Sequence, residues 1–165
     1  MIILGVDPGT ATTGYGFIQR ERGKLVHLAS GVVRTDKSAE APDRLLTIYS
    51  ALNRLIDLHE PDVLATERLF FSSNVTNALQ VGRTVGIILL MAAQRGLPWM
   101  EYRPSEVKMA VVGYGSAEKS QVQFMVQQLL HLGKPPKPDD AADALAIAIC
   151  HANTANLAVL RSGAN

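Results

Sequence analysis

Residues 1–17 read MIILGVDPGTATTGYGF, a short apolar run that ends at Asp7 and continues into a glycine-rich segment. The continuous, β-branched run over residues 2–6 predicts a buried strand. Two chemistries use such an opening. A glycine-rich turn can cradle the phosphates of a nucleotide, whereas a carboxylate at the end of a strand can hold a metal ion. This stretch by itself leaves both interpretations open.

The rest of the chain predicts a mixed sheet with helices on its faces. Two β-like runs, residues 15–20 and 25–34, flank a polar turn and predict a hairpin. Further strands are predicted at 62–66 and 97–102, and helices at about 45–59, 75–93, 104–112, 117–131 and 139–152. A meander that leads into βαβ units is typical of an α/β fold with antiparallel and parallel strands in one sheet. We expect residues 1–153 to form a single domain and residues 154–165 a flexible tail.

Composition narrows the class of protein. The chain has 165 residues, 47% of them hydrophobic and 19% charged, which is typical of a globular domain. Its formal net charge is only +1, so the overall charge does not indicate that the protein binds nucleic acid. The single cysteine, Cys150, excludes an internal disulfide and fits a reducing cytosol. We expect neither a signal peptide nor a membrane span, because Asp7 interrupts the first apolar stretch and the longest one is short. A cytoplasmic protein is expected.

Acidic residues follow two predicted strands and open the last predicted helix. Asp7 and Glu67 lie at strand ends, where functional sites of open α/β sheets gather. Asp140 and Asp143 are three residues apart, so they project from nearly one helix face. Clustered carboxylates repel one another unless cations neutralise them, and hard oxygen ligands suit Mg²⁺ or Mn²⁺. Two such ions about 4 Å apart can hydrolyse a phosphodiester.

Each acid also has a structural explanation. Asp7 can form a turn before Pro8, and Glu67 can be a solvated strand end. Asp139 and Asp140 can cap the last helix, and for Asp139 this interpretation is preferred. Asp143 is harder to explain in this way, because it lies among alanines on an apolar helix and a buried acid needs a partner or a metal.

Several segments together resemble the RuvC family of Holliday-junction resolvases. They are GVDPGT at residues 5–10, the strand that ends in Glu67, VVGYGSAEKSQV at 111–122 and DAADALAIAIC at 140–150. The resemblance spans nearly the whole chain. It implies an RNase H-like fold with a five-stranded mixed sheet, in a homodimeric bacterial endonuclease of DNA recombination and repair that nicks two opposed strands of a four-way junction.

The resemblance also implies site residues and partners. Asp7, Glu67, Asp140 and Asp143 correspond to the family's catalytic and metal-binding carboxylates, with two Mg²⁺ ions, replaceable by Mn²⁺, in each active site. The DAAD pattern favours Asp140 over Asp139 as a ligand. By resemblance the partners are junction DNA, a second copy of the chain and a RuvA/RuvB-like branch-migration complex, with no membrane.

Four residues are expected to contact DNA. Arg68 and Phe70 lie in the loop after Glu67, where Phe70 matches a phenylalanine that enters the junction in RuvC-like proteins. An exposed ring can stack on an unpaired base. Lys108 and Lys119 resemble the family's phosphate-contacting lysines. Lys119 lies in the first turn of a predicted helix, where a cation opposes the helix dipole unless an anion binds nearby.

Alternatives remain at two points. Gly82 and Gly86 are four apart on one helix, which suits close packing against the sheet, while the resemblance suggests a dimer interface. The activity also has alternatives: an ATP-binding module like those of actin and sugar kinases, or a generic RNase H-like nuclease. The first normally requires two domains and a second phosphate loop, which this sequence does not show.

Overall fold

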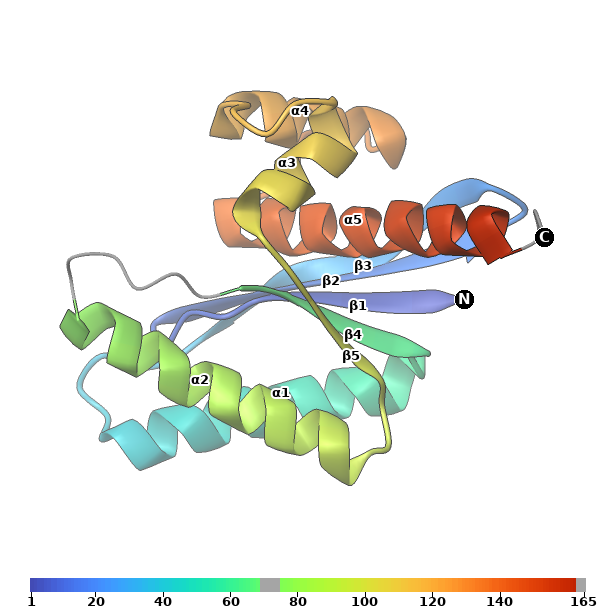
Figure 1. Cartoon of the computed structure of the whole chain (residues 1–165). Helices are drawn as coiled ribbons and strands as arrows, with labels where there is room; N and C mark the ends of the chain where they lie inside the picture. The colour runs from blue at the N-terminus through green and yellow to red at the C-terminus, as the bar shows by residue number, and fades with distance from the viewer. Residues whose placement is uncertain (69–74, 163–165) are drawn as a thin grey trace.

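A five-stranded mixed sheet forms the centre of the molecule (Figure 1). The structure is a computed structural model that describes residues 1–68 and 75–162. The strand order is β3-β2-β1-β4-β5, with antiparallel pairing across β1, β2 and β3 and parallel pairing of β4 with β1 and of β5 with β4. The strands are β1 (Ile2–Asp7), β2 (Thr12–Glu21), β3 (Lys24–Arg34), β4 (Val63–Glu67) and β5 (Trp99–Tyr102). The predicted meander followed by parallel strands is confirmed.

The helices cover both faces of this sheet (Figure 1). On one face lie α1 (Ala41–His59) and α2 (Val75–Gln94), and on the other lie α3 (Pro104–Val112), α4 (Lys119–Leu129) and α5 (Asp139–Ser162). Each face buries its own apolar cluster, because successive side chains of a strand point to opposite sides. Along β1, Leu4 and Val6 pack in the cluster under α1 and α2, whereas Ile3 packs in the cluster under α5.

Glycines in β1 and β2 let α5 approach the sheet closely. A Cβ atom added to Gly5 would overlap the backbone of Ala144, and one added to Gly14 would overlap the backbone of Asp140. At Gly16 an added Cβ would lie only 2.7 Å from Cδ2 of Leu145. The backbone of α5 therefore rests almost directly on the backbone of these strands, and this contact fixes the height of the α5 acids above the sheet.

Several predicted boundaries differ from the structure, and three of them have a clear structural reason. The last helix extends to Ser162 rather than ending at Ala152, because the alanines and leucines of residues 155–160 favour helix. The final strand begins at Trp99 rather than Leu97, because the amide of Leu97 donates to the carbonyl of Ala92 and completes the end of α2. Similarly, α4 begins only at Lys119, after the cap provided by Glu118.

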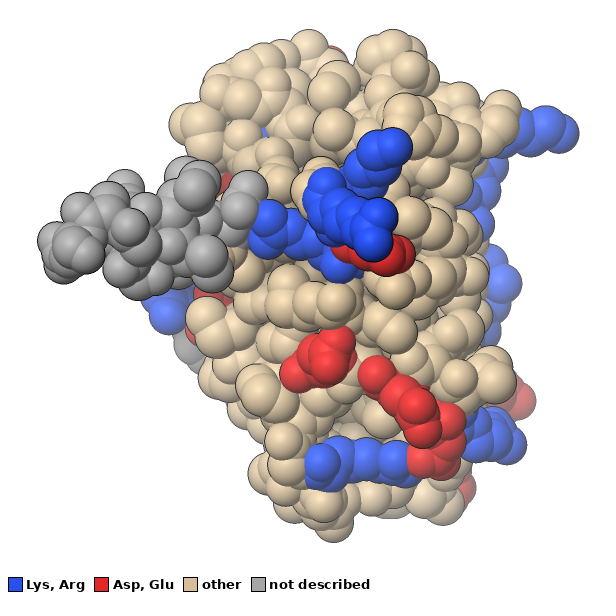
Figure 2. Space-filling view, turned by 90° about the vertical axis from the view of Figure 1, so that its right-hand side faces the viewer, with Lys and Arg blue, Asp and Glu red and all other residues tan. Residues whose placement is uncertain are grey.

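The end of the molecule at which the N-terminus lies carries a mixture of positive and negative side chains (Figure 2). Figure 2 views this end, and basic and acidic side chains lie beside one another on it. The opposite end, to which the C-terminal ends of β1 and β4 point in Figure 1, carries the acids described below. None of the helices in the described part of the chain is long and apolar enough to cross a lipid bilayer.

Candidate active site

The four predicted acids come from three elements that meet at one end of the sheet. Asp7 is the last residue of β1, and Glu67 is the last residue of β4. These strands are parallel neighbours whose register pairs Val6 with Thr66, so the two acids follow at adjacent positions. Asp140 and Asp143 lie in the first turns of α5, which packs across β1 and β2.

The turn after Asp7 has structural hydrogen bonds of its own. The hydroxyl of Thr10 donates to the carbonyl of Gln80 at 2.9 Å, and the hydroxyl of Thr13 donates to the carbonyl of Gly9 at 2.6 Å. These contacts tie the glycine-rich segment to α2 and to itself. The arrangement favours the second interpretation of the opening segment, in which Asp7 supplies the chemistry and the turn holds it in place.

Electrostatic repulsion concentrates on Asp7. Burial, which is the largest cause, and the negative charges of Asp143, Glu67 and Asp140 together raise the pKa of Asp7 from 3.8 to about 7, and the positive charge of Lys119 partly opposes this rise. A carboxyl group with this pKa is partly protonated at neutral pH. A cation in the cluster would remove the penalty for ionising it, because an opposite charge favours the charged form.

Glu67 and Asp143, which are partly buried, show the same effect with local compensation. Burial and the charge of Asp143 raise the pKa of Glu67, and the nearby ammonium of Lys108 lowers it. Burial also raises the pKa of Asp143, but a hydrogen bond from Lys119 opposes this. The cluster therefore combines excess negative charge with two lysines that offset part of it.

Lys119 is the cation that directly contacts the acids. Its Nζ lies 3.0 Å from Oδ2 of Asp143 and 3.5 Å from Oδ2 of Asp139. The sequence interpretation assigned Lys119 to DNA phosphates and Asp139 to a helix cap, and it missed this contact. The signal was present, because a lysine in the first turn of a helix calls for an anionic partner, which can be a side chain as well as a phosphate.

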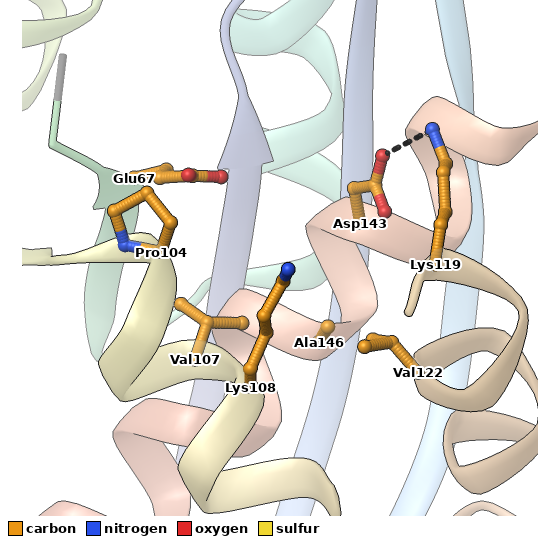
Figure 3. Close-up of a pocket in the computed structure, with 8 residues that line it drawn as sticks. All are labelled: Glu67, Pro104, Val107, Lys108, Lys119, Val122, Asp143 and Ala146. Atoms are coloured by element: carbon orange, nitrogen blue, oxygen red, sulfur yellow. Dashed lines mark ion pairs between the residues drawn. The ribbon is translucent and has the colours of Figure 1, made fainter. Parts of the chain in front are cut away.

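A cavity of about 240 Å³ opens beside the acids. Figure 3 shows Glu67 and Asp143 on opposite sides of it, with Lys108 between them and Lys119 paired to Asp143. Pro104, Val107, Val122 and Ala146 complete its lining with apolar surface. The cavity thus brings two acids and two lysines, drawn from β4, α3, α4 and α5, to one opening.

The acids fit a divalent metal by their chemistry. Among residues 1–68 and 75–162, no three side chains of histidine, cysteine, aspartate or glutamate are grouped closely enough to hold an ion as they stand. The cluster nevertheless presents only hard carboxylate oxygens, and burial and mutual repulsion raise the pKa of Asp7 to about 7. Both properties suit Mg²⁺ or Mn²⁺, which would relieve the repulsion and draw the oxygens together.

The remaining predicted DNA contacts have separate outcomes. Arg68 follows β4 directly, and its Nε donates to Oε2 of Glu101 at 2.8 Å, with about half of the Arg68 side chain still exposed. Lys108 projects from α3 into the cavity (Figure 3). Phe70 lies outside the described residues.

Comparison with known proteins places this chain in a family. A family model described as crossover junction endodeoxyribonuclease RuvC matches residues 3–151. The protein of that name from Alkaliphilus oremlandii is 52% identical over 156 residues, covering 94% of this chain and 95% of its own. The one from Heliobacterium modesticaldum is 54% identical over 154 residues, covering 93% and 95%.

Solved structures agree with the sequence relatives. Thermus thermophilus RuvC superposes with a TM-score of 0.87 at 34% identity, covering 96% of this chain and 97% of its own. The same protein in complex with Holliday junction substrate gives a TM-score of 0.88 at 32% identity, covering 95% and 96%. The yeast mitochondrial Holliday junction resolvase, at 17% identity and a TM-score of 0.67, shares the fold. The chain belongs to the RuvC family of crossover junction endodeoxyribonucleases.

Proposed function

We propose that this chain resolves four-way (Holliday) DNA junctions by paired, symmetric nicks in two opposed strands, through hydrolysis of phosphodiester bonds. The observation that carries the proposal is the meeting of Asp7, Glu67, Asp140 and Asp143 at one sheet end, in a chain of the RuvC family. The raised pKa of Asp7 and the cavity beside Glu67 and Asp143 support a reaction at this position.

The family consists of metal-dependent nucleases, and we infer that Asp7, Glu67, Asp140 and Asp143 hold two Mg²⁺ ions, with Mn²⁺ able to substitute. When bound, such ions lower the pKa of an attacking water and stabilise the departing 3′ oxygen of the scissile phosphate. The four carboxylates supply both ligand oxygens and compensating negative charge. Asp139 is left out of this set, because the DAAD pattern of the family begins at Asp140 and the side chain of Asp139 is 61% exposed.

The two lysines of the cavity contact the scissile phosphate of the substrate. Lys108 and Lys119 line the same opening as Glu67 and Asp143, so a DNA strand that reaches the acids also reaches two ammonium groups. Their positive charge orients the phosphate against the acids and offsets the charge that develops on it. We propose that Arg68 and Phe70, in the loop after β4, also contact the junction beside this opening.

A dimer explains the two glycines of α2. A Cβ atom added to Gly82 or Gly86 would meet nothing within 4 Å in the described part of the chain, so packing against its own sheet does not account for them. Leu79 and Leu90 lie on the same stripe of α2, and they are 58% and 56% exposed. We propose that this stripe packs against a second copy. Two-fold symmetry then presents two active sites to two opposed strands.

The cellular setting follows from the same proposal. Branch migration moves the crossover point of a junction along the DNA, and we propose that the dimer acts together with a RuvA/RuvB-like complex that drives this movement. The buried, unpaired thiol of Cys150 is consistent with a reducing cytoplasm, where we place the protein.

Cleavage of a synthetic four-way junction beside a linear duplex of the same sequence tests the function. We expect paired nicks in the junction with Mg²⁺ or Mn²⁺, no cleavage after chelation, and little cleavage of the duplex. Equal cleavage of junction and duplex would instead identify a generic RNase H-like nuclease. ATP hydrolysis that copurifies with the protein, without nicking, would favour the nucleotide-binding alternative.

A further inference from the structure

The hydroxyl of Thr10 joins the turn after Asp7 to two successive turns of α2. Its Oγ1 donates to the carbonyl of Gln80 at 2.9 Å and lies 3.1 Å from Oγ1 of Thr84. A threonine hydroxyl has a single proton, so Thr84 is the donor in the second contact. Thr84 is fully buried, so its hydroxyl makes this contact in place of a hydrogen bond to water.

The turn is too tight to absorb a shift of α2. A Cβ atom added to Gly9 would overlap the first carbonyl group of β2, and the hydroxyl of Thr13 donates to the carbonyl of Gly9 at 2.6 Å. On the side away from α2, the hydroxyl of Thr35 donates to the carbonyl of Thr10 at 2.7 Å. The backbone from Asp7 to Thr10 therefore moves as one piece, and a displacement at Thr10 reaches Asp7.

The part of α2 that contacts Thr10 has little buried surface in its own chain. Among residues 78–86, Thr84 is the only buried one, whereas Ile88 and Met91 supply buried apolar contacts further along the helix. A helical segment with few buried contacts opens at a low cost in free energy. A second copy that packs on the exposed stripe of α2 would hold this segment in place.

We propose that Thr10 is a positioning residue that couples the dimer to the acid cluster. The partner copy holds α2, the α2 residues Gln80 and Thr84 hold the hydroxyl of Thr10, and the tight turn keeps Asp7 beside the other acids. This coupling rests on the proposed nuclease function and its dimer. Each active site is then fully assembled only when a second copy packs on α2, and Thr10 acts through Asp7 without touching the substrate.

Removal of the hydroxyl tests the positioning role. Thr10→Val keeps nearly the same shape, and at saturating four-way junction with Mg²⁺ it should nick at least about tenfold more slowly, because a small displacement of a reacting group is costly. Its affinity for the junction should stay near that of the wild type, so the loss lies in kcat rather than in binding. Thr10→Ser, which keeps the hydroxyl, should recover most of the rate.

Two further variants complete this comparison, with all rates measured well below each melting temperature. Thr47→Val is the matched control, because it removes a hydroxyl that donates to the carbonyl of Asp43 at 2.8 Å on α1, and it should nick as the wild type does. Thr84→Val removes the other hydroxyl of the pair and should show a loss of the same kind. It tests the contact from the α2 side if Thr10→Val does not fold.

A double variant separates coupling to the dimer from a defect within one chain. Leu90→Lys places a charge on the α2 stripe and should give a monomer, in which α2 lacks its partner. In that monomer the further change Thr10→Val should slow the nicking of single strands by less than about threefold, because the two changes interrupt the same connection and are not additive. Sedimentation of each protein at the assay concentration reports which species is measured.

Four results would contradict the proposal. Thr10→Val that nicks at the wild-type rate would show that the hydroxyl does not position Asp7, and Thr10→Ser as slow as Thr10→Val would assign the effect to packing. An equal fold loss from Thr10→Val in the dimer and in the Leu90→Lys monomer would confine its role to one chain. Leu90→Lys that remains a dimer would show that the partner does not hold α2. Failure of the proposed function is distinguishable, since the wild type itself would then leave the junction uncut with Mg²⁺.

Discussion

At the scale of single residues, the site is defined by charge that the fold does not neutralise. Asp7 shows this most clearly, because burial and three neighbouring acids raise its pKa to about 7 and only Lys119 opposes them. In the metal-free protein this carboxyl group exchanges a proton near neutral pH. The raised pKa of Asp7 therefore makes the stability of the metal-free fold depend on pH in a defined direction.

Metal-free stability should fall as the pH rises. The folded pKa of Asp7, about 7, exceeds its ordinary value of 3.8, so the folded state keeps a proton that the unfolded state has lost. The contribution of Asp7 is complete below about pH 4 and disappears as the pH passes about 7, up to about 4 kcal/mol at about 1.4 kcal/mol per pKa unit. Urea unfolding in EDTA at a series of pH values measures this decline.

Asp7→Asn provides the control for that measurement, since an amide does not titrate. The free energy of unfolding of this variant should fall much less over the same pH range, and Mg²⁺ should flatten the wild-type curve. Parallel pH profiles for the wild type and Asp7→Asn would contradict the assigned pKa shift.

Sequence reasoning located the acids but not their internal cation. Asp7 and Glu67 were predictable because each ends an apolar strand, and the topology of parallel neighbours brings such ends together. The contact of Lys119 with Asp143 was not predictable in this way, because α4 and α5 are separated by a connection of irregular structure. Only tertiary packing determines that the start of α4 faces the start of α5.

At the scale of elements, the contact between α5 and the sheet positions half of the acid cluster. Asp140 and Asp143 move with α5, whereas Asp7 and Glu67 are fixed on strands. The glycines of β1 and β2 set the distance between these two groups of acids by allowing close backbone contact. Any side chain at the contact must lift α5 away from the sheet or force the strands to shift.

Gly14→Ala should therefore impair both stability and cleavage. The added methyl group would overlap the backbone of Asp140, and overpacking of this kind destabilises by about 1–3 kcal/mol. The measurements are urea unfolding and the Mg²⁺-dependent cleavage rate. Gly133→Ala serves as the control, because a Cβ there meets nothing within 4 Å, and this variant should retain both properties. A Gly14→Ala variant as stable and active as Gly133→Ala would show that α5 tolerates displacement.

The limits of prediction at this scale have a physical origin. The sheet was predictable because its strands are short apolar runs with clear breaks, and the order of elements restricts the topology. The end of α5 was not, because the polar residues Asn153 and Thr154 suggest fraying while the following alanines and leucines favour helix. The close packing of Gly14 on Asp140 has no signal in local periodicity at all.

At the scale of the whole molecule, activity requires two active sites at a fixed separation. A single chain carries one acid cluster, and paired nicks need a second one related by two-fold symmetry. The stripe of α2 formed by Leu79, Gly82, Gly86 and Leu90 offers an exposed apolar face with room for close approach of another helix. The dimer thus presents one phosphodiesterase site to each of two opposed strands of the junction.

Leu90→Lys should convert the dimer to a monomer, because it buries an unpaired charge at the proposed interface. We expect analytical ultracentrifugation to report the monomer mass, and junction nicking to become slow and unpaired. Leu46→Lys is the matched control, since Leu46 is 61% exposed on α1 and outside the α2 stripe. A Leu90→Lys variant that sediments as the wild type does would place the interface elsewhere.

The most direct test of the central claim, that the four acids form the metal-dependent cleavage site, compares single amide substitutions in one assay. Asp7→Asn, Glu67→Gln, Asp140→Asn and Asp143→Asn should each bind a four-way junction nearly as well as the wild type and nick it at a rate reduced by at least about a hundredfold with Mg²⁺. Asp139→Asn removes the same charge from the same helical turn and should retain most of the activity. Near wild-type nicking by Asp7→Asn or Glu67→Gln would contradict the site.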